Sequence, residues 1–72
     1  MPIERQPVVS SDIASIGYDE AGQTLEIEFK ATGVYRYFSV PKPAFDELMA
    51  TPSPGKFFRQ HIKGKYAWEN TQ

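Results

Sequence analysis

The segment "LEIEFKATGVYRYFSV", Leu25 to Val40, decides the fold class of this 72-residue chain. Apolar and charged residues alternate along its first half, with Leu25, Ile27 and Phe29 set against Glu26, Glu28 and Lys30. A period of two places the apolar residues on one face of a β-strand and the charged residues on the other. The next residues, Ala31–Gly33, predict a three-residue hairpin loop in which Gly33 takes the left-handed conformation.

The position of this loop decides which face two tyrosines occupy, because loop length fixes strand register. With Ala31–Gly33 as the loop, the opposed pairs are Phe29 and Tyr35, Ile27 and Tyr37, and Glu28 and Arg36. A two-residue loop would set Glu28 against Tyr35 and lose the alternation. We therefore predict that both tyrosines join the core, although their spacing would also suit a platform that stacks nucleic-acid bases. Val34, Phe38 and Val40 then fall on the charged face, which predicts a bulge or a covering segment near Phe38.

The flanking sequence predicts one further strand before this hairpin and two short helices after it. Ile16 and Tyr18 alternate upstream, whereas residues 1–9 predict a flexible arm. The first helix is indicated by apolar residues at helical spacing, which are Phe45, Leu48 and Met49. The second begins after Ser53 as N-cap and ends at Gly64. We predict one α+β domain over residues 10–68, a three-stranded antiparallel meander followed by two short helices packed on one face, with a tail at 69–72.

Length and composition limit the classes of protein. A 72-residue chain without cysteine has neither disulfides nor a thiolate metal site. Ten aromatic residues (five Phe, four Tyr, one Trp) must supply much of its core. No apolar run approaches the roughly 20 residues of a membrane span, so we expect a cytoplasmic protein without a membrane segment.

Enzymatic chemistry finds little support in the sequence. His61 is the sole histidine and lies at helical spacing from Phe57, Phe58 and Ile62, which predicts a packed side chain rather than a catalytic base. Glu26 and Glu28 are regularly spaced, and we expect them to form a solvated strand face. We therefore predict no catalytic residue, no metal site and no cofactor.

The charges are unevenly distributed, although the formal net charge is −1. Residues 48–68 contain no acid and four cations, which are Lys56, Arg59, Lys63 and Lys65. A basic helix face of this kind can follow a nucleic-acid backbone, and Tyr66 or Trp68 nearby could stack a base. Of the two we predict Tyr66 as a residue of the site. Ser53 lies at a helix N-terminus, where amide donors, its own hydroxyl and the Lys56 cation would suit a phosphate, although we favour an ordinary N-cap. A lysine-rich solvated helix face is the alternative interpretation of these cations.

Several motifs, taken in order, resemble the KTSC domain family, and they are "IGYD" at residues 16–19, "LEIEF" at 25–29, "GVYRYFSVP" at 33–41 and "SPGKFF" at 53–58. The family is named for its occurrence at the C-terminus of some lysyl-tRNA synthetases and also includes small free-standing bacterial proteins. The resemblance implies that the matching residues Tyr35, Tyr37, Gly55, Phe57 and Phe58 are family motif positions with a structural role. Arg59 stands where the family tends to have asparagine.

The sequence is consistent with two functions. The link to a synthetase and the basic helix face both favour weak, salt-dependent binding of RNA, such as tRNA. The alternative is a protein-interaction module, such as a homodimer, that uses an edge strand or the sheet face around Phe38 and Val40.

Overall fold

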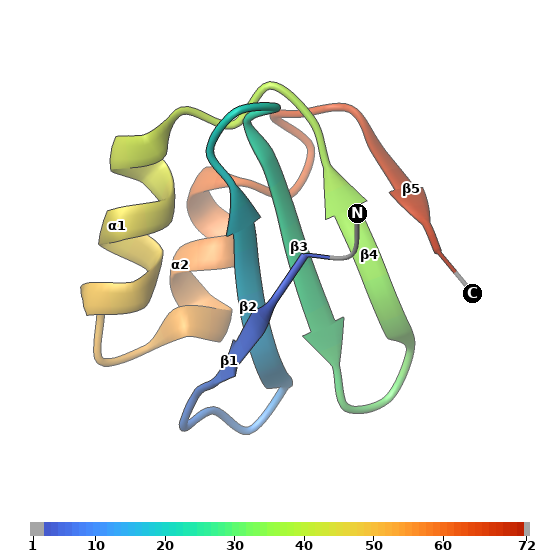
Figure 1. Cartoon of the computed structure of the whole chain (residues 1–72). Helices are drawn as coiled ribbons and strands as arrows, with labels where there is room; N and C mark the ends of the chain where they lie inside the picture. Colours follow the sequence, from blue (N-terminus) through green and yellow to red (C-terminus); the bar gives the residue numbers. More distant parts are fainter. Residues whose placement is uncertain (1–2, 72) are drawn as a thin grey trace.

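The chain folds into an antiparallel sheet with two helices on one of its faces (Figure 1). The structure, a computed structural model, describes residues 3–71, so that our expectations for Met1, Pro2 and Gln72 lie outside the described residues. In chain order, the elements are β1 (Arg5–Pro7), β2 (Ile13–Asp19), β3 (Thr24–Phe29), β4 (Gly33–Tyr37), α1 (Lys42–Ala50), α2 (Pro54–His61) and β5 (Trp68–Asn70). The strands lie in the spatial order β1-β2-β3-β4-β5. The predicted α+β class is confirmed, but within residues 3–71 the sheet has five strands rather than three.

The two strands that we did not predict lie at the edges of the sheet. β1 falls within residues 1–9, the expected flexible arm, and pairs with β2. β5 begins at Trp68, continues into the expected tail at 69–72, and pairs with β4. Each has three residues and is mostly polar. Strands this short cannot show an alternating pattern, so their conformation depends on partners that only the fold brings near.

The β3–β4 hairpin keeps the predicted faces but shifts its partners by two residues. Its loop is residues 30–32 rather than Ala31–Gly33, and Gly33 begins β4 with a φ of +98°. The pairs that replace the predicted ones are Ile27 with Tyr35, Leu25 with Tyr37, and Glu26 with Arg36. A shift by two leaves every side chain on its predicted face, so alternation alone could not distinguish these registers.

The predicted irregularity near Phe38 is a backbone bend at Ser39, whose φ is +59°. The bend turns Val40 into the core, where it is fully buried, instead of onto the charged face as we expected. The Val40 N–H donates to the carbonyl of Gln23, and its carbonyl accepts a hydrogen bond from the Tyr18 hydroxyl. The exposed apolar patch that we predicted around Phe38 and Val40 is therefore reduced to the half-buried Phe38.

The core lies between the helices and the inner face of the sheet. Its buried members are Ile13, Ile16, Leu25, Ile27, Tyr37, Val40, Leu48, Phe58 and Ile62. Tyr18 extends this packing to α1, because its ring stacks on Phe45 with 4.9 Å between centroids. Burial, followed by the nearby charge of Glu20, raises the pKa of Tyr18. Ser53 is the N-cap residue of α2, as predicted, although its side chain makes no capping hydrogen bond.

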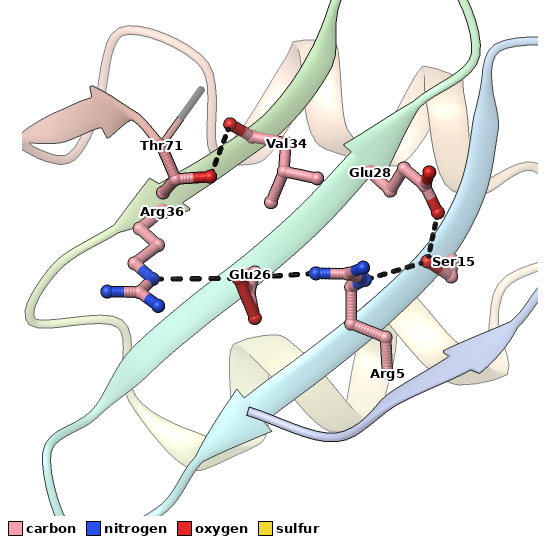
Figure 2. Close-up of polar contacts among 7 residues, drawn as sticks. All are labelled: Arg5, Ser15, Glu26, Glu28, Val34, Arg36 and Thr71. Atoms are coloured by element: carbon pink, nitrogen blue, oxygen red, sulfur yellow. Dashed lines mark hydrogen bonds and ion pairs between the residues drawn. The ribbon is translucent and has the colours of Figure 1, made fainter. Parts of the chain in front are cut away.

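The opposite face of the sheet carries a buried charge, which corrects our expectation that Glu26 is solvated (Figure 2). Glu26 is 4% exposed, and its Oε1 lies 3.3 Å from Arg5 Nη1 and 3.6 Å from Arg36 Nε. Arg5 reaches it across Gly17, which lies between them in one row of paired residues. A Cβ on Gly17 would lie 2.5 Å from the carbonyl oxygen of Glu4 and 3.1 Å from Arg5 Cγ. The missing side chain therefore lets β1 approach β2 and lets Arg5 cover the carboxylate.

Candidate nucleic-acid interface

The predicted cations lie on the outer side of α2 and directly after it. Lys56, Arg59, Lys63 and Lys65 are all exposed. The same helical period turns Phe58 toward the core. The sequence therefore predicted correctly which side of α2 carries these charges.

His61 departs from that pattern, because it is exposed rather than packed in the core. Its ring lies 4.6 Å from the ring of Phe57, with an angle of 34° between their planes. Phe57 is itself half-buried, so this contact covers one side of the imidazole and leaves the rest at the surface. Our prediction that His61 packs on the apolar face holds for its contact with Phe57, but the side chain is exposed because it lies at the margin of that face and not at its centre.

A cleft of about 450 Å³ opens between α2 and the inner face of β3, β4 and β5. Five aromatic side chains line it, and they are Phe29, Tyr35, Tyr37, Phe58 and Trp68. Their rings hold one another in place by edge-to-face and tilted contacts, with centroids 5.0–6.5 Å apart. Arg59 and Lys63 line the same cleft. It therefore combines an aromatic floor with two cations at its margin.

The two tyrosines of the central hairpin differ in this cleft. Tyr37 is buried and belongs to the core cluster, and its burial, together with the neighbouring Tyr35, raises its pKa. Tyr35 is half-buried and packs against that cluster from the side, with its ring 5.4 Å from Trp68. Both tyrosines share the helix-covered face, and Tyr35 is the more exposed of the two.

Trp68, rather than the predicted Tyr66, is the aromatic side chain that this cleft presents to solvent. Trp68 is 55% exposed, whereas Tyr66 is half-buried against the core and does not line the cleft. Their alternation was visible in the sequence, but the choice between them depended on the pairing of β5. Because Trp68 lies opposite Tyr37 in the register, its ring projects from the helix-covered face.

A second, more polar hollow of about 450 Å³ adjoins the aromatic cleft at the start of α2. Its lining includes Ser10, Ser11, Ser53 and Lys56. Ser10 shapes the floor, because its Oγ accepts hydrogen bonds from the backbone N–H groups of Asp12 and Ile13. Sequence reasoning had placed Ser53 and Lys56 at one site but had not assigned the two serines that join them.

The two hollows share three lining residues, which are Asp12, Gly55 and Arg59. Arg59 Nη1 lies 3.4 Å from Asp12 Oδ2. A Cβ on Gly55 would lie 3.3 Å from the same oxygen, so the glycine makes room for the carboxylate against the first turn of α2. Asp12 was absent from the predicted site because it is distant from Arg59 in sequence.

Other kinds of site receive no support from the described part of the chain. Within residues 3–71, no group of three or more His, Cys, Asp or Glu side chains could hold a metal ion. No helix in the same range is long and apolar enough to cross a membrane.

The fold and the cleft define a small α+β domain in which a basic helix borders an aromatic surface. The family model for the KTSC domain matches residues 9–66, so the chain belongs to the KTSC domain family and the resemblance seen in the sequence is confirmed. A crystal structure of a KTSC domain protein from Yersinia pestis is similar to this chain, with a TM-score of 0.96 and 44% identity. The similarity covers 99% of this chain and 100% of the Yersinia pestis chain.

Two further relatives illustrate where such domains occur. A protein of Tsukamurella paurometabola is 41% identical over 61 residues, which are 85% of this chain and 91% of that protein. A lysine–tRNA ligase of Nostoc punctiforme is 42% identical over 59 residues, which are 82% of this chain but 10% of the ligase. A similar domain therefore stands almost alone in one relative and forms a small part of a large enzyme in the other.

Proposed function

We propose that this chain is a non-enzymatic domain that binds RNA through unpaired nucleotides, with tRNA as one such ligand. The observation that carries the proposal is the aromatic cleft, in which the exposed Trp68 stands beside Tyr35 and is bordered by Arg59 and Lys63. Unstacked bases bind to aromatic rings, and cations beside those rings bind the adjoining phosphates. The cleft also falls within the usual volume of ligand pockets, about 300–1,000 Å³.

The cations predict how such binding should depend on salt. Lys56, Arg59, Lys63 and Lys65 are exposed and lie on or directly after one helix. Four phosphate contacts to a single strand imply a slope of roughly −3 in a plot of log affinity against log salt concentration. Stacking of one base would add about 1–3 kcal/mol that depends little on salt.

The ligase relatives add support of a different kind. As their name states, these enzymes join lysine to tRNA, and a segment similar to this chain makes up 10% of one of them. An appended domain that contacts tRNA would be useful to an enzyme of that class. This support is associational, whereas the cleft supplies the physical reason.

The first experiment is an amide chemical-shift titration of the labelled domain with bulk tRNA, at low and then at moderate salt. We expect salt-dependent shifts that cluster on residues 56–65 and on the Trp68 indole N–H. Absence of any shift at low salt would remove RNA as the ligand.

Paired variants locate the surface. Lys63→Gln removes a charge that lines the cleft, and Lys42→Gln removes the same charge from α1 outside both hollows. Only Lys63→Gln should weaken binding by more than the change in net charge explains. Trp68→Ala should weaken RNA binding more than Lys63→Gln does, and it should reduce the part of the binding free energy that does not depend on salt. Equal losses of affinity in both lysine variants would contradict the proposed surface.

A protein-interaction module is the second candidate, favoured by one feature of the sheet. β5 is an edge strand whose three residues are all exposed, and such an edge can pair with another chain. Sedimentation over a range of concentrations tests the homodimer form of this candidate, and a strictly monomeric protein would exclude it.

A further inference from the structure

Asp12 lies where the two hollows meet and faces the cation that both of them share. Its Oδ2 is 3.4 Å from Arg59 Nη1, and both side chains are more than half exposed, 55% for Asp12 and 62% for Arg59. The pair therefore lies at the surface, on the path between the aromatic cleft and the polar hollow. It joins the start of β2 to α2 without being part of the core.

The surroundings of the Asp12 carboxylate are those of a bound anion. The guanidinium of Arg59 contacts it, and Gly55 lets it lie against the first turn of α2, where the helix dipole is positive. Of the described residues that line the two hollows, Asp12 is the one carboxylate, against the cations Lys56, Arg59 and Lys63. The Asp12 carboxylate therefore neutralises Arg59, the cation that lines both hollows.

We infer that Asp12 is an internal competitor of the RNA phosphate for Arg59. This inference rests on the proposed RNA-binding function and concerns its regulation. When a nucleotide enters the aromatic cleft, its phosphate replaces the Asp12 carboxylate on the guanidinium, and the two hollows become one groove. Exposed ion pairs are weak, so the exchange is feasible, and the pair lowers affinity without abolishing it.

Two measurable consequences follow from the exchange. Removal of the Asp12 charge should tighten binding about two- to fivefold, the range that an exposed ion pair of this kind accounts for. It should also make the salt dependence steeper by about 0.7 in the log–log slope. In the unaltered protein the displaced Asp12 carboxylate takes up a cation from solution, which offsets the counterion that the RNA phosphate releases at Arg59. The slope of roughly −3 for four phosphate contacts is therefore reached in full only when the Asp12 charge is removed.

The test uses a short oligouridylate as the probe and compares affinity and salt slope across a set of variants. Asp12→Asn keeps the side-chain shape and removes the charge, and Asp12→Ala is a second variant in case the amide makes a new contact. Glu20→Gln is the matched control, because it changes net charge equally at the turn between β2 and β3, at the opposite end of β2. Asp12→Asn is also measured in an Arg59→Gln background.

We expect Asp12→Asn to bind more tightly and with a steeper slope, Glu20→Gln to match the unaltered protein, and the slope change to vanish in the Arg59→Gln background. Unchanged or weaker binding by both Asp12 variants would overturn the inference while leaving RNA binding intact. A gain that persists in full without Arg59 would also overturn it, because the effect would then be general repulsion. If the unaltered protein binds no oligouridylate or tRNA, the proposed function fails and this inference fails with it.

Discussion

Replacement of Glu26 by glutamine should destabilise the domain by about 1–3 kcal/mol. The carboxylate lies between two guanidinium groups on the face of the sheet away from the helices (Figure 2). Glutamine has nearly the same shape, so the substitution opens no cavity and removes only the charge. Arg5 and Arg36 would then face each other across a neutral amide.

The magnitude follows from the exposure of the three side chains. Removal of one partner from a fully buried ion pair costs about 3–5 kcal/mol, whereas an exposed pair contributes roughly 0–1 kcal/mol. The Glu26 side chain is 5% exposed, but Arg5 and Arg36 are 31% and 36% exposed and remain partly solvated. The expected cost therefore lies between the two limits.

Urea unfolding, followed by circular dichroism, measures this cost directly. In a domain of this size, 1 kcal/mol corresponds to about 4–8 °C in Tm, so thermal melting should show a clear decrease as well. Glu28→Gln is the matched control. Glu28 is only half-buried, and its Oε1 accepts one hydrogen bond of 2.9 Å from Ser15 Oγ. If Glu26→Gln is no less stable than Glu28→Gln, the ion pairs of Glu26 with Arg5 and Arg36 do not stabilise the domain as proposed.

Three other changes test the packing on either side of the sheet. Tyr37→Ala should reduce the free energy of unfolding by about 3–5 kcal/mol, because Tyr37 is 5% exposed within the core, and most molecules should then be unfolded at 25 °C. A folded variant with native dispersion of its amide signals would refute the core role of Tyr37. Because burial raises the pKa of Tyr37 above its ordinary value of 10.0, the folded state favours the protonated phenol. The stability gained from the protonated Tyr37 phenol is fully present below pH 10.0 and is lost as the pH rises through the higher pKa of the folded state. Thermal melting measured from neutral pH to above pH 10 should therefore show a smaller decrease in Tm at alkaline pH for Tyr37→Phe than for the unaltered protein. Identical dependence of Tm on pH in the two proteins would contradict this. Gly17→Ala should weaken the pairing of β1 with β2, because the added Cβ would lie 2.5 Å from the carbonyl oxygen of Glu4. Hydrogen exchange should then be faster at the Gln6 amide and unchanged at the Ile27 amide. Protection at Gln6 equal to that in the unaltered protein would count against this prediction.

The sequence contained enough information to predict the central hairpin and both helices. Alternation in β3 assigned the correct face to Ile27 and to both tyrosines, because a period of two is a local property of the strand. The helical spacing of Phe58 and Ile62 assigned the inner side of α2 in the same way. Local periodicity thus predicted the core-facing residues of β3, β4 and α2, apart from the exposed His61.

The parts that sequence reasoning missed depend on contacts between distant segments. β1 and β5 have too few residues for any period, and the burial of Glu26 depends on Arg5, which reaches it from β1. The same holds for the candidate site, where Asp12 and Arg59 are separated by 47 positions. A carboxylate on an alternating strand is usually solvated, and only the tertiary neighbours of Glu26 make it an exception.

An acidic total charge does not by itself oppose RNA binding by this domain. The formal net charge is −1, but the acids and bases are sorted by position in the fold. Glu26 is neutralised by two arginines on the face away from the helices, so its charge adds little to the field at the cleft. At the two hollows the lining cations outnumber the acids, and the acid that is present, Asp12, is paired with one of them. The potential that a phosphate meets is set by these local groups within about 8–10 Å, which is the screening length at physiological salt. A variant that alters net charge elsewhere should therefore leave affinity almost unchanged, whereas a single substitution at Asp12 should alter it.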